Sequence, residues 1–346
     1  MKIALAQLNY HVGNFELNTA KIIEAVEQSR SQGAEIVVFA ELAVCGYPPR
    51  DFLEFDDFLD RCMSSINRIA QASTGITTII GGPARNPKVE GKNLYNAAFV
   101  LRDGKIADEH YKALLPTYDV FDEYRYFEPS KDFHVVEISG KKIALTICED
   151  LWDIEDDLMY TLWPMEELKH QGAEIMINIA ASPFSYSHAE KRREVMQRNA
   201  VKYGMPLVYV QHVGAQTELI FDGGSMVLNA KGEVTEQLPF FKEELRVVDT
   251  SAPHHGGQAL SMTTVPQKSS AELLSKQARI HDALVLGIKD YFSKMGFTKA
   301  ILGLSGGVDS ALVLVLAVEA LGKENVLPVL LPSEISSQHS IDDSVE

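Results

Sequence analysis

The chain has 346 residues, a formal net charge of −16 at pH 7 and 46% hydrophobic residues. This length predicts about two domains, and the apolar fraction can support a sizeable core. The negative charge argues against nucleic-acid backbones and anionic membranes as main partners, although a small anion site built from backbone N–H groups remains compatible with it.

The three cysteines, Cys45, Cys62 and Cys148, include no close pair. Their spacing argues against a disulfide framework or a zinc cluster and favours a reducing compartment. The N-terminal alternation "MKIALAQLNYHVGN" is typical of a strand rather than a signal peptide, and the longest apolar run, 311–321, is too short to span a bilayer. We therefore expect a soluble, cytoplasmic protein that binds neither nucleic acid nor membrane.

The first 250 residues alternate between strand-like and helix-like patterns, which predicts one α/β domain with helices covering sheets. Strands are expected near 2–8, 77–83, 97–102, 142–148, 206–213 and 224–229, and helices over 15–31, 57–72, 156–171 and 188–203.

Two segments of this region repeat the same order of features. In "QGAEIVVFAE" (32–41) and "QGAEIMINIA" (171–180), an amphipathic run ends at the second residue, Gly33 or Gly172, as a helix ends at a C′ glycine. A β-branched strand then starts at once. The pattern predicts helix, tight turn and buried strand, twice.

A change of composition marks the end of the first domain. Residues 251–270 are rich in Gly, Pro, Ser and Thr without a hydrophobic period, which predicts a linker. The adjacent His254 and His255 have no acids or cysteines nearby, which argues against a metal site there. A helix over 271–294, a strand over 299–305, a helix over 309–321 and a strand over 325–331 then form a βαβ unit with parallel strands. A doubly wound domain needs more strands, so we expect 271–346 to be the first part of a larger domain.

The turn of this βαβ unit reads "LGLSGGVDSALV". Gly306 and Gly307 allow a tight turn, and Ser305, Asp309 and Ser310 offer polar groups and a helix N-cap. Successive N–H groups at a helix N-terminus suit a phosphate. The loop is neither a Walker A motif nor a dinucleotide fingerprint, so a plain glycine-rich turn with a capping Asp is an equal reading of the residues.

Cys148 poses a separate question, because it ends an apolar strand and two acids follow it in "IALTICEDLW". Neighbouring negative charge raises the pKa of a thiol, so the local sequence favours an inert core cysteine. Glu41 and Lys112 also follow predicted strands, where they could equally be ordinary solvated residues. Taken singly, none of the three residues indicates catalysis.

Taken together, these motifs resemble known families. The loop S-G-G-V-D-S and the segment "PSEISSQHS" resemble the ATP pyrophosphatases and, within them, NAD synthetases. The order Glu41, Lys112, Cys148, with "ELAVCGYPPRD" and "CEDLW", resembles the nitrilase superfamily of carbon–nitrogen hydrolases. The two together resemble the glutamine-dependent NAD synthetase family. The resemblance implies a four-layer αββα sandwich over 1–250, a linker over 251–270 and an incomplete, doubly wound parallel-sheet domain over 271–346.

The resemblance also implies roles for individual residues. Cys148 would attack the glutamine carboxamide, Glu41 would move the proton, Lys112 and the backbone N–H of Glu149 would stabilise the oxyanion, and Glu123 would position Lys112. Residues expected around the glutamine are Tyr118, Trp152, Ser182 and His188; His188 stands where an arginine was expected, with Arg192 and Arg193 further on. The ATP pyrophosphate would bind Ser305, Gly306, Gly307, Val308, Asp309 and Ser310, with Asp309 as a Mg²⁺ ligand.

The expected substrates are glutamine, ATP and deamido-NAD, with Mg²⁺ in the second domain and no cofactor in the first. A homo-oligomer is expected by resemblance alone. Three alternatives stay open: amidation of another adenylated carboxylate, a stand-alone amidase with a vestigial second domain, and a non-catalytic binding module. The catalytic reading requires Cys148, Lys112 and Glu41 to converge, with Glu149 and Asp150 directed elsewhere because side chains alternate along an extended strand.

Overall fold

The structure is a computed structural model that describes residues 1–88, 90–152, 154, 160–250, 275–332 and 337–345. The chain forms two compact units, one of residues 1–213 with 221–272 and one of residues 214–220 with 273–346. The predicted linker lies outside the described residues, so its boundaries stay a prediction. Among the described helices, none is both long enough and apolar enough to cross a membrane.

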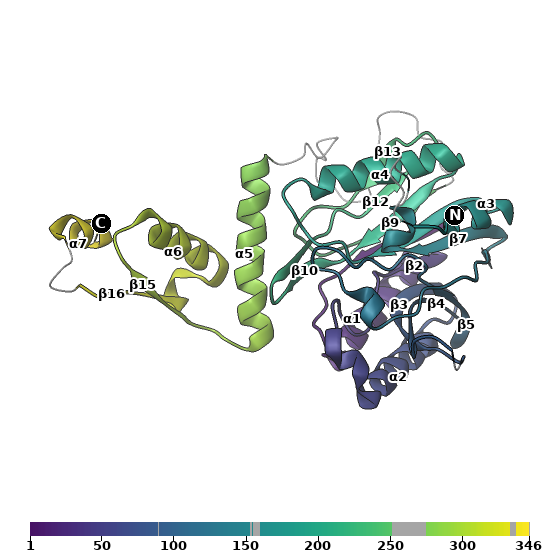
Figure 1. Cartoon of the computed structure of the whole chain (residues 1–346), viewed down its shortest axis with the longest axis horizontal. Helices are drawn as coiled ribbons and strands as arrows, with labels where there is room; N and C mark the ends of the chain where they lie inside the picture. The colour runs from purple at the N-terminus through teal and green to yellow at the C-terminus, as the bar shows by residue number, and fades with distance from the viewer. Residues whose placement is uncertain (89, 153, 155–159, 251–274, 333–336, 346) are drawn as a thin grey trace. The chain divides into compact units, whose positions relative to one another are not determined.

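Two six-stranded sheets form the centre of the first unit (Figure 1). The first has the order β14 (Glu244–Asp249), β1 (Lys2–Gln7), β2 (Ile36–Val38), β3 (Thr77–Arg85), β4 (Leu94–Arg102) and β5 (Lys105–Tyr111). The second has the order β13 (Val234–Gln237), β12 (Met226–Leu228), β9 (Leu207–Gln211), β8 (Ile175–Ala180), β7 (Lys141–Ile147) and β6 (Val136–Ile138).

Helices cover the outer face of each sheet. Helices α1 (Phe15–Ser31) and α2 (Asp56–Ala72) pack on the first sheet, and α3 (Pro164–His170) and α4 (His188–Tyr203) pack on the second. The inner faces share one core, in which Ile3, Ile36 and Val100 of the first sheet cluster with Ile143 and Ile177 of the second. The predicted four-layer αββα sandwich is therefore confirmed.

The helix–glycine–strand repeat is present in both sheets. Gly33 and Gly172 have φ of +77° and +87°, a conformation that glycine adopts at little cost, and they follow α1 and α3. Strands β2 and β8 then run parallel to both of their neighbours. Residues 156–159 of the helix predicted over 156–171 lie outside the described residues; α3 itself begins at Pro164, where proline suits the first helical turn.

Sequence patterns missed several strands. Strand β14 alternates weakly, yet it pairs antiparallel with β1 over six residue pairs from Lys2↔Asp249 to Gln7↔Glu244. Strand β5, which is mostly polar, is the strand expected before Lys112. The other missed strands are short: β6, β13, β10 (Val213–Gln216) and β11 (Leu219–Asp222). One-turn 3₁₀ helices η1 (Arg50–Glu54), η2 (Glu123–Arg125) and η3 (Cys148–Leu151) connect strands and helices near the site.

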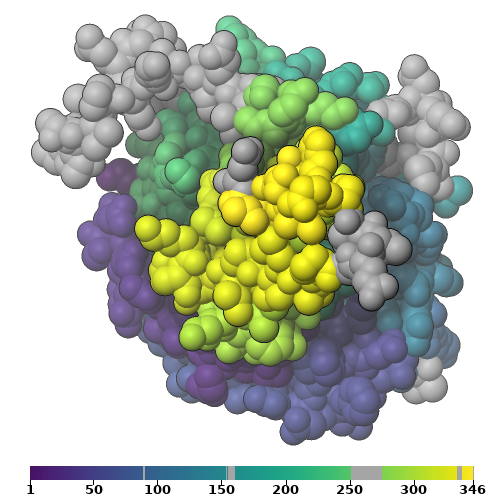
Figure 2. All heavy atoms as spheres, turned by 90° about the vertical axis from the view of Figure 1, so that its left-hand side faces the viewer, coloured from purple at the N-terminus to yellow at the C-terminus, as the bar shows by residue number. Residues whose placement is uncertain are grey.

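The second unit contains α5 (Lys276–Met295), β15 (Ala300–Leu304), α6 (Val308–Leu321), η4 (Lys323–Asn325), β16 (Val326–Leu330) and α7 (Gln338–Val345). Strands β15 and β16 pair in parallel, which agrees with the start of a doubly wound domain. Helix α5 begins later than predicted, because the Ser275 side chain caps it by accepting the Ala278 N–H. Figure 2 shows the surface of this unit in yellow and yellow-green; on it Val308, Leu312 and Leu331 are exposed.

Candidate active site

A buried cluster of three charged side chains lies between the two sheets. The Lys112 Nζ is 2.7 Å from Glu41 Oε1 and 2.8 Å from Glu123 Oε2, and none of the three side chains is more than 5% exposed. Burial alone would lower the pKa of Lys112, but the charges of Glu123 and Glu41 outweigh it and raise the pKa. Lys112 is therefore held as an ammonium between two carboxyl groups.

Glu41 is fixed from several directions. Asn96 Nδ2 donates to Glu41 Oε1 at 2.7 Å, and the Ala181 N–H donates to Glu41 Oε2 at 2.9 Å. The next residue, Leu42, has φ of +48°, which is strained for a bulky side chain. The turn also needs Gly81, because a Cβ there would lie 2.2 Å from the Leu42 N. The strained turn aims one carboxylate into the space between the sheets.

Cys148 follows β7 directly and opens η3 with φ of +43°. Burial raises the pKa of the Cys148 thiol well above its usual range; Glu41 raises it further and Lys112 opposes the rise. The charges of Glu41 and Lys112 thus both act on the Cys148 thiol. The thiol keeps its proton at neutral pH, so a nucleophilic role would require a base.

The two acids after Cys148 were both expected to be directed away from the thiol, and the contacts of Asp150 agree with this expectation. The Asp150 carboxylate accepts hydrogen bonds from the backbone N–H groups of Ala113, Leu114 and Ile147 at 2.9–3.0 Å, so backbone donors satisfy it. The Glu149 carboxylate instead raises the pKa of Cys148. Strand alternation does not apply here, because the chain enters a 3₁₀ turn at Cys148.

Glu149 is a functional candidate whose carboxylate the sequence reasoning missed. It is buried, and it accepts hydrogen bonds from Tyr118 Oη at 2.9 Å and Tyr160 Oη at 3.1 Å. Burial raises the pKa of Glu149, while the Lys112 charge lowers it. A buried carboxylate with two phenol donors can bind a ligand ammonium group.

Three of the expected glutamine contacts lie together. The rings of Trp152 and His188 stack with centroids 5.0 Å apart, and His188 Nε2 lies 3.0 Å from Ser182 Oγ. Burial, with the nearby charge of Arg192, lowers the pKa of His188 to about 4, so the ring is neutral at pH 7. A neutral imidazole can donate a hydrogen bond to a carboxylate but cannot balance its charge.

Arg192 supplies a buried positive charge in the same region. Its Nη2 lies 2.9 Å from both carboxylate oxygens of Asp222, while its Nε and Nη1 make no hydrogen bond to the described residues. Burial alone would lower the pKa of Arg192, but the charge of Asp222 outweighs it and raises the pKa. Arg193 pairs with Gln237 instead.

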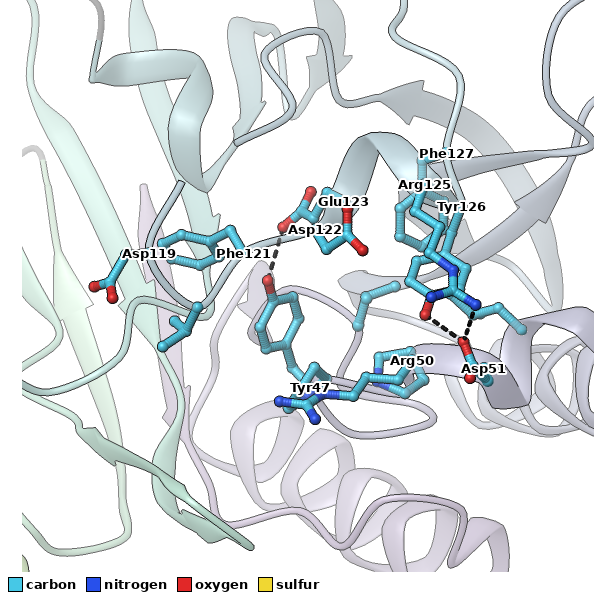
Figure 3. A pocket seen from close by; sticks show the side chains of 15 residues that line it. Tyr47, Arg50, Asp51, Asp119, Phe121, Asp122, Glu123, Arg125, Tyr126 and Phe127 are labelled. Atoms are coloured by element: carbon cyan, nitrogen blue, oxygen red, sulfur yellow. Dashed lines mark hydrogen bonds and ion pairs between the residues drawn. The ribbon is translucent and has the colours of Figure 1, made fainter. Parts of the chain in front are cut away.

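A cavity of about 370 Å³ adjoins the ion cluster and is lined by residues of 42–53 and 119–127 (Figure 3). Tyr47 points from its wall and donates to Glu123 Oε1 at 2.9 Å. At another point of the wall, Asp51 accepts from Tyr126 and pairs with Arg125. Glu123, a member of the buried cluster, itself lines this cavity next to Tyr47.

The glycine loop of the second unit has a different cap from the one expected. Gly307 is the N-cap of α6, so no side chain caps the helix, and Asp309 lies exposed in the first turn. Ser310 Oγ accepts from the Ser305 N–H at 3.3 Å and donates to the Gly307 carbonyl at 2.9 Å. Gly306 has φ of +76°, and a Cβ there would lie 2.2 Å from the Ser340 carbonyl oxygen. Val308 begins the helix and is 80% exposed.

The site combines a candidate nucleophile, a carboxylate and an ammonium, each after a strand of the sandwich. This combination agrees with the family whose profile matches the sequence. The chain belongs to the carbon–nitrogen hydrolases, whose family profile matches residues 2–254. The profile of NAD synthase matches residues 280–346.

Relatives give a narrower similarity. The chain is 41% identical to a glutamine-dependent NAD(+) synthetase of Synechocystis and 36% identical to that of Thermotoga maritima, over 99% of this chain and 62% of each relative. It resembles the structure of the Acinetobacter baumannii glutamine-dependent NAD+ synthetase in complex with ADP, at 34% identity and a TM-score of 0.86 over 100% of this chain and 62% of that one. An amidase of the nitrilase superfamily from Nesterenkonia, 24% identical, shares the fold over 72% of this chain and 90% of its own, with a TM-score of 0.61. The chain thus spans about 62% of the length of the synthetases it matches.

Proposed function

We propose that the first unit hydrolyses glutamine and that the chain is the glutaminase part, with the beginning of the ligase part, of a glutamine-dependent NAD synthetase. The observation that carries the proposal is the buried Lys112 ammonium between Glu41 and Glu123, beside a thiol that keeps its proton. The names of the synthetases that match 99% of the chain support the substrate assignment.

The proposed reaction begins with proton transfer. Glu41 accepts the Cys148 proton as the sulfur attacks the carboxamide carbon, which forms a tetrahedral oxyanion. Lys112 and the backbone N–H of Glu149 stabilise that oxyanion. Glu41 returns the proton to the departing nitrogen, and ammonia leaves a γ-glutamyl thioester on Cys148. Water, deprotonated by Glu41, then releases glutamate and restores the thiol.

Glu123 and Tyr47 position the reacting groups in this proposal. Two short contacts hold Lys112 between Glu41 and Glu123, and Tyr47 fixes the second carboxyl group. The ammonium cannot rotate away, so its charge is already in place when the oxyanion forms.

Glutamine recognition requires opposite charges for its two α-substituents. Glu149, with Tyr118 and Tyr160, is suited to the α-ammonium group. The unpaired nitrogens of Arg192, together with Ser182 and His188, are suited to the α-carboxylate, and Trp152 stacks against His188.

The second unit would bind ATP through residues 305–310. The N–H groups at the start of α6 suit the pyrophosphate, and the tight loop depends on Gly306. Asp309 offers an exposed carboxylate oxygen there, which fits a Mg²⁺ ion that is held by one or two carboxylates and by substrate phosphates. Such an ion, when bound, would neutralise charge on the pyrophosphate. The ligase substrates would be deamido-NAD and ATP, with AMP released as ammonia displaces it, and the assembly would be a homo-oligomer.

Ammonia release from glutamine tests the hydrolase step. Cys148→Ala should abolish it, while Cys62→Ala, which removes a buried thiol of α2, should keep it. Equal activity of the Cys148→Ala variant would overturn the proposal. The ligase step is tested in a protein of the relatives' full length, which should convert deamido-NAD with ATP and glutamine; AMP formation with other carboxylates only would overturn this substrate assignment.

A further inference from the structure

A second cluster of chemically active side chains lies in the first unit, at the edge shared by the two sheets. Asp108 and His110 are two residues apart on β5, the last strand of the first sheet, so both side chains lie on one face. Their strand partners, Val100 and Ala98, belong to the core between the sheets. His134 precedes β6, the last strand of the second sheet.

The ligand atoms of the cluster converge. His134 Nε2 lies 3.0 Å from Asp108 Oδ1, and His110 Nε2 lies 3.5 Å from Asp108 Oδ2. The two imidazole rings stack with centroids 4.2 Å apart, and one donor atom from each residue lies within 4.8 Å of the other two. A tetrahedral ion about 2.1 Å from each donor would hold donors roughly 3.4 Å apart, which is close to this spacing.

His110 provides an independent sign that the cluster is built for a ligand. Its side chain is 7% exposed, and its Nε2 faces the Asp108 carboxylate at 3.5 Å without making a hydrogen bond to the part of the chain that the structure describes. A buried imidazole nitrogen without a hydrogen bond is costly, and a metal ion removes that cost. The Asp108 carboxylate is oriented by the Glu109 N–H at 2.9 Å.

Solvent can reach the cluster from one side. The His134 side chain is 48% exposed and also lines an open groove with Asp132, Trp163 and His170. An ion could enter there and keep water on its remaining position.

We propose that Asp108, His110 and His134 bind one divalent transition-metal ion of the Zn²⁺ type. Two imidazoles and one carboxylate suit Zn²⁺, Co²⁺ and Ni²⁺ better than Mg²⁺ or Ca²⁺, which prefer oxygen ligands. The ion joins the edge strand of the first sheet to the segment that enters the second. It is separate from the glutamine chemistry, and its effect is to stabilise the closed edge of the sandwich.

Zinc binding to the 346-residue chain tests the proposal, in a background from which one thiol and the two adjacent histidines are removed. Cys148→Ala removes the buried thiol, and His254→Ser with His255→Ser removes the adjacent histidines. Titration calorimetry with Zn²⁺ should give one site of micromolar or tighter affinity, and Co²⁺ should give visible absorption typical of four- or five-coordination. Zn²⁺ should also raise the melting temperature. Absence of Zn²⁺ and Co²⁺ binding in the micromolar range would overturn the proposal.

Variants locate the site. His134→Gln and Asp108→Asn should each weaken Zn²⁺ binding by more than the roughly 10- to 100-fold that loss of a supporting hydrogen bond costs. Glu109→Gln is the matched control, because it removes an acid from the same strand that pairs with Tyr111 instead. His134 is half exposed, so its variant should still fold. Unchanged binding in His134→Gln and Asp108→Asn, or a loss in Glu109→Gln equal to theirs, would contradict the proposed site.

Discussion

Replacing Lys112 by methionine tests the electrostatic design of the buried cluster. The ammonium is 2.7 Å from Glu41 and 2.8 Å from Glu123, and both carboxyl groups are buried. Without the ammonium, two acids remain in the core without a cation. Removing one partner of a buried ion pair typically costs about 3–5 kcal/mol of unfolding free energy. Loss of an oxyanion donor typically lowers kcat by about 10²–10³-fold.

Two assays separate these effects. Urea denaturation should show the lower unfolding free energy of Lys112→Met, and ammonia release at saturating glutamine should show the lower kcat. The double variant Lys112→Met/Glu123→Gln removes one of the two uncompensated acids, so it should recover much of the stability while its kcat stays low. If Lys112→Met were as stable and active as the wild type, or if the second change restored no stability, the electrostatic account would be refuted.

Three further changes probe other parts of the site. Glu149→Gln should raise the KM for glutamine by roughly 10- to 100-fold with a smaller effect on kcat, because a hydrogen bond to a charged group contributes about 1.5–3 kcal/mol; an unchanged KM would contradict ammonium binding there. Gly81→Ala should lower the free energy of unfolding by about 1–3 kcal/mol and remove much of the activity, because its Cβ would clash with the Leu42 N. Gly303→Ala is the control and should cost little, because no atom lies within 4 Å of a Cβ there. Equal effects of the two changes would refute the packing argument. Burial raises the pKa of Asp150 from 3.8 to about 6, so the folded state favours the protonated carboxyl group. This contribution to the free energy of unfolding is full below about pH 4 and is lost as the pH rises through 6. The stability difference between wild type and Asp150→Asn should therefore fall by up to roughly 3 kcal/mol from pH 4 to 7, and a difference that rises with pH would contradict this sign.

Sequence patterns predicted the elements that carry strong periodicity. Helix α1 and helix α4 have the predicted bounds, and the glycines at 33 and 172 end their helices as expected. Strand β14 was missed because its weak alternation hides an edge strand of the sheet, which pairs with β1. Such pairing depends on partners distant in sequence, so local composition does not reveal it.

The residue types of the candidate site were predictable from the sequence, but the directions of its side chains were less so. Glu41, Lys112 and Cys148 each come after a strand, as expected, but these strands (β2, β5 and β7) are not neighbours within one sheet, so strand order alone does not predict that the residues lie near one another. The direction of Glu149 depends on the positive φ of Cys148, which no residue preference reveals. Tyr160 and Arg192 also escaped clear prediction, because their roles depend on the buried partners Glu149 and Asp222.

The central claim, that Cys148 forms a γ-glutamyl thioester, can be measured directly. The chain is mixed with glutamine, quenched in acid within the first turnover and analysed by intact and peptide mass spectrometry. The account predicts a mass increase of one γ-glutamyl group on the peptide that contains Cys148, absent from Cys148→Ala and from samples without glutamine. Ammonia release without any such adduct on Cys148, or with the adduct on Cys45 or Cys62, would contradict it.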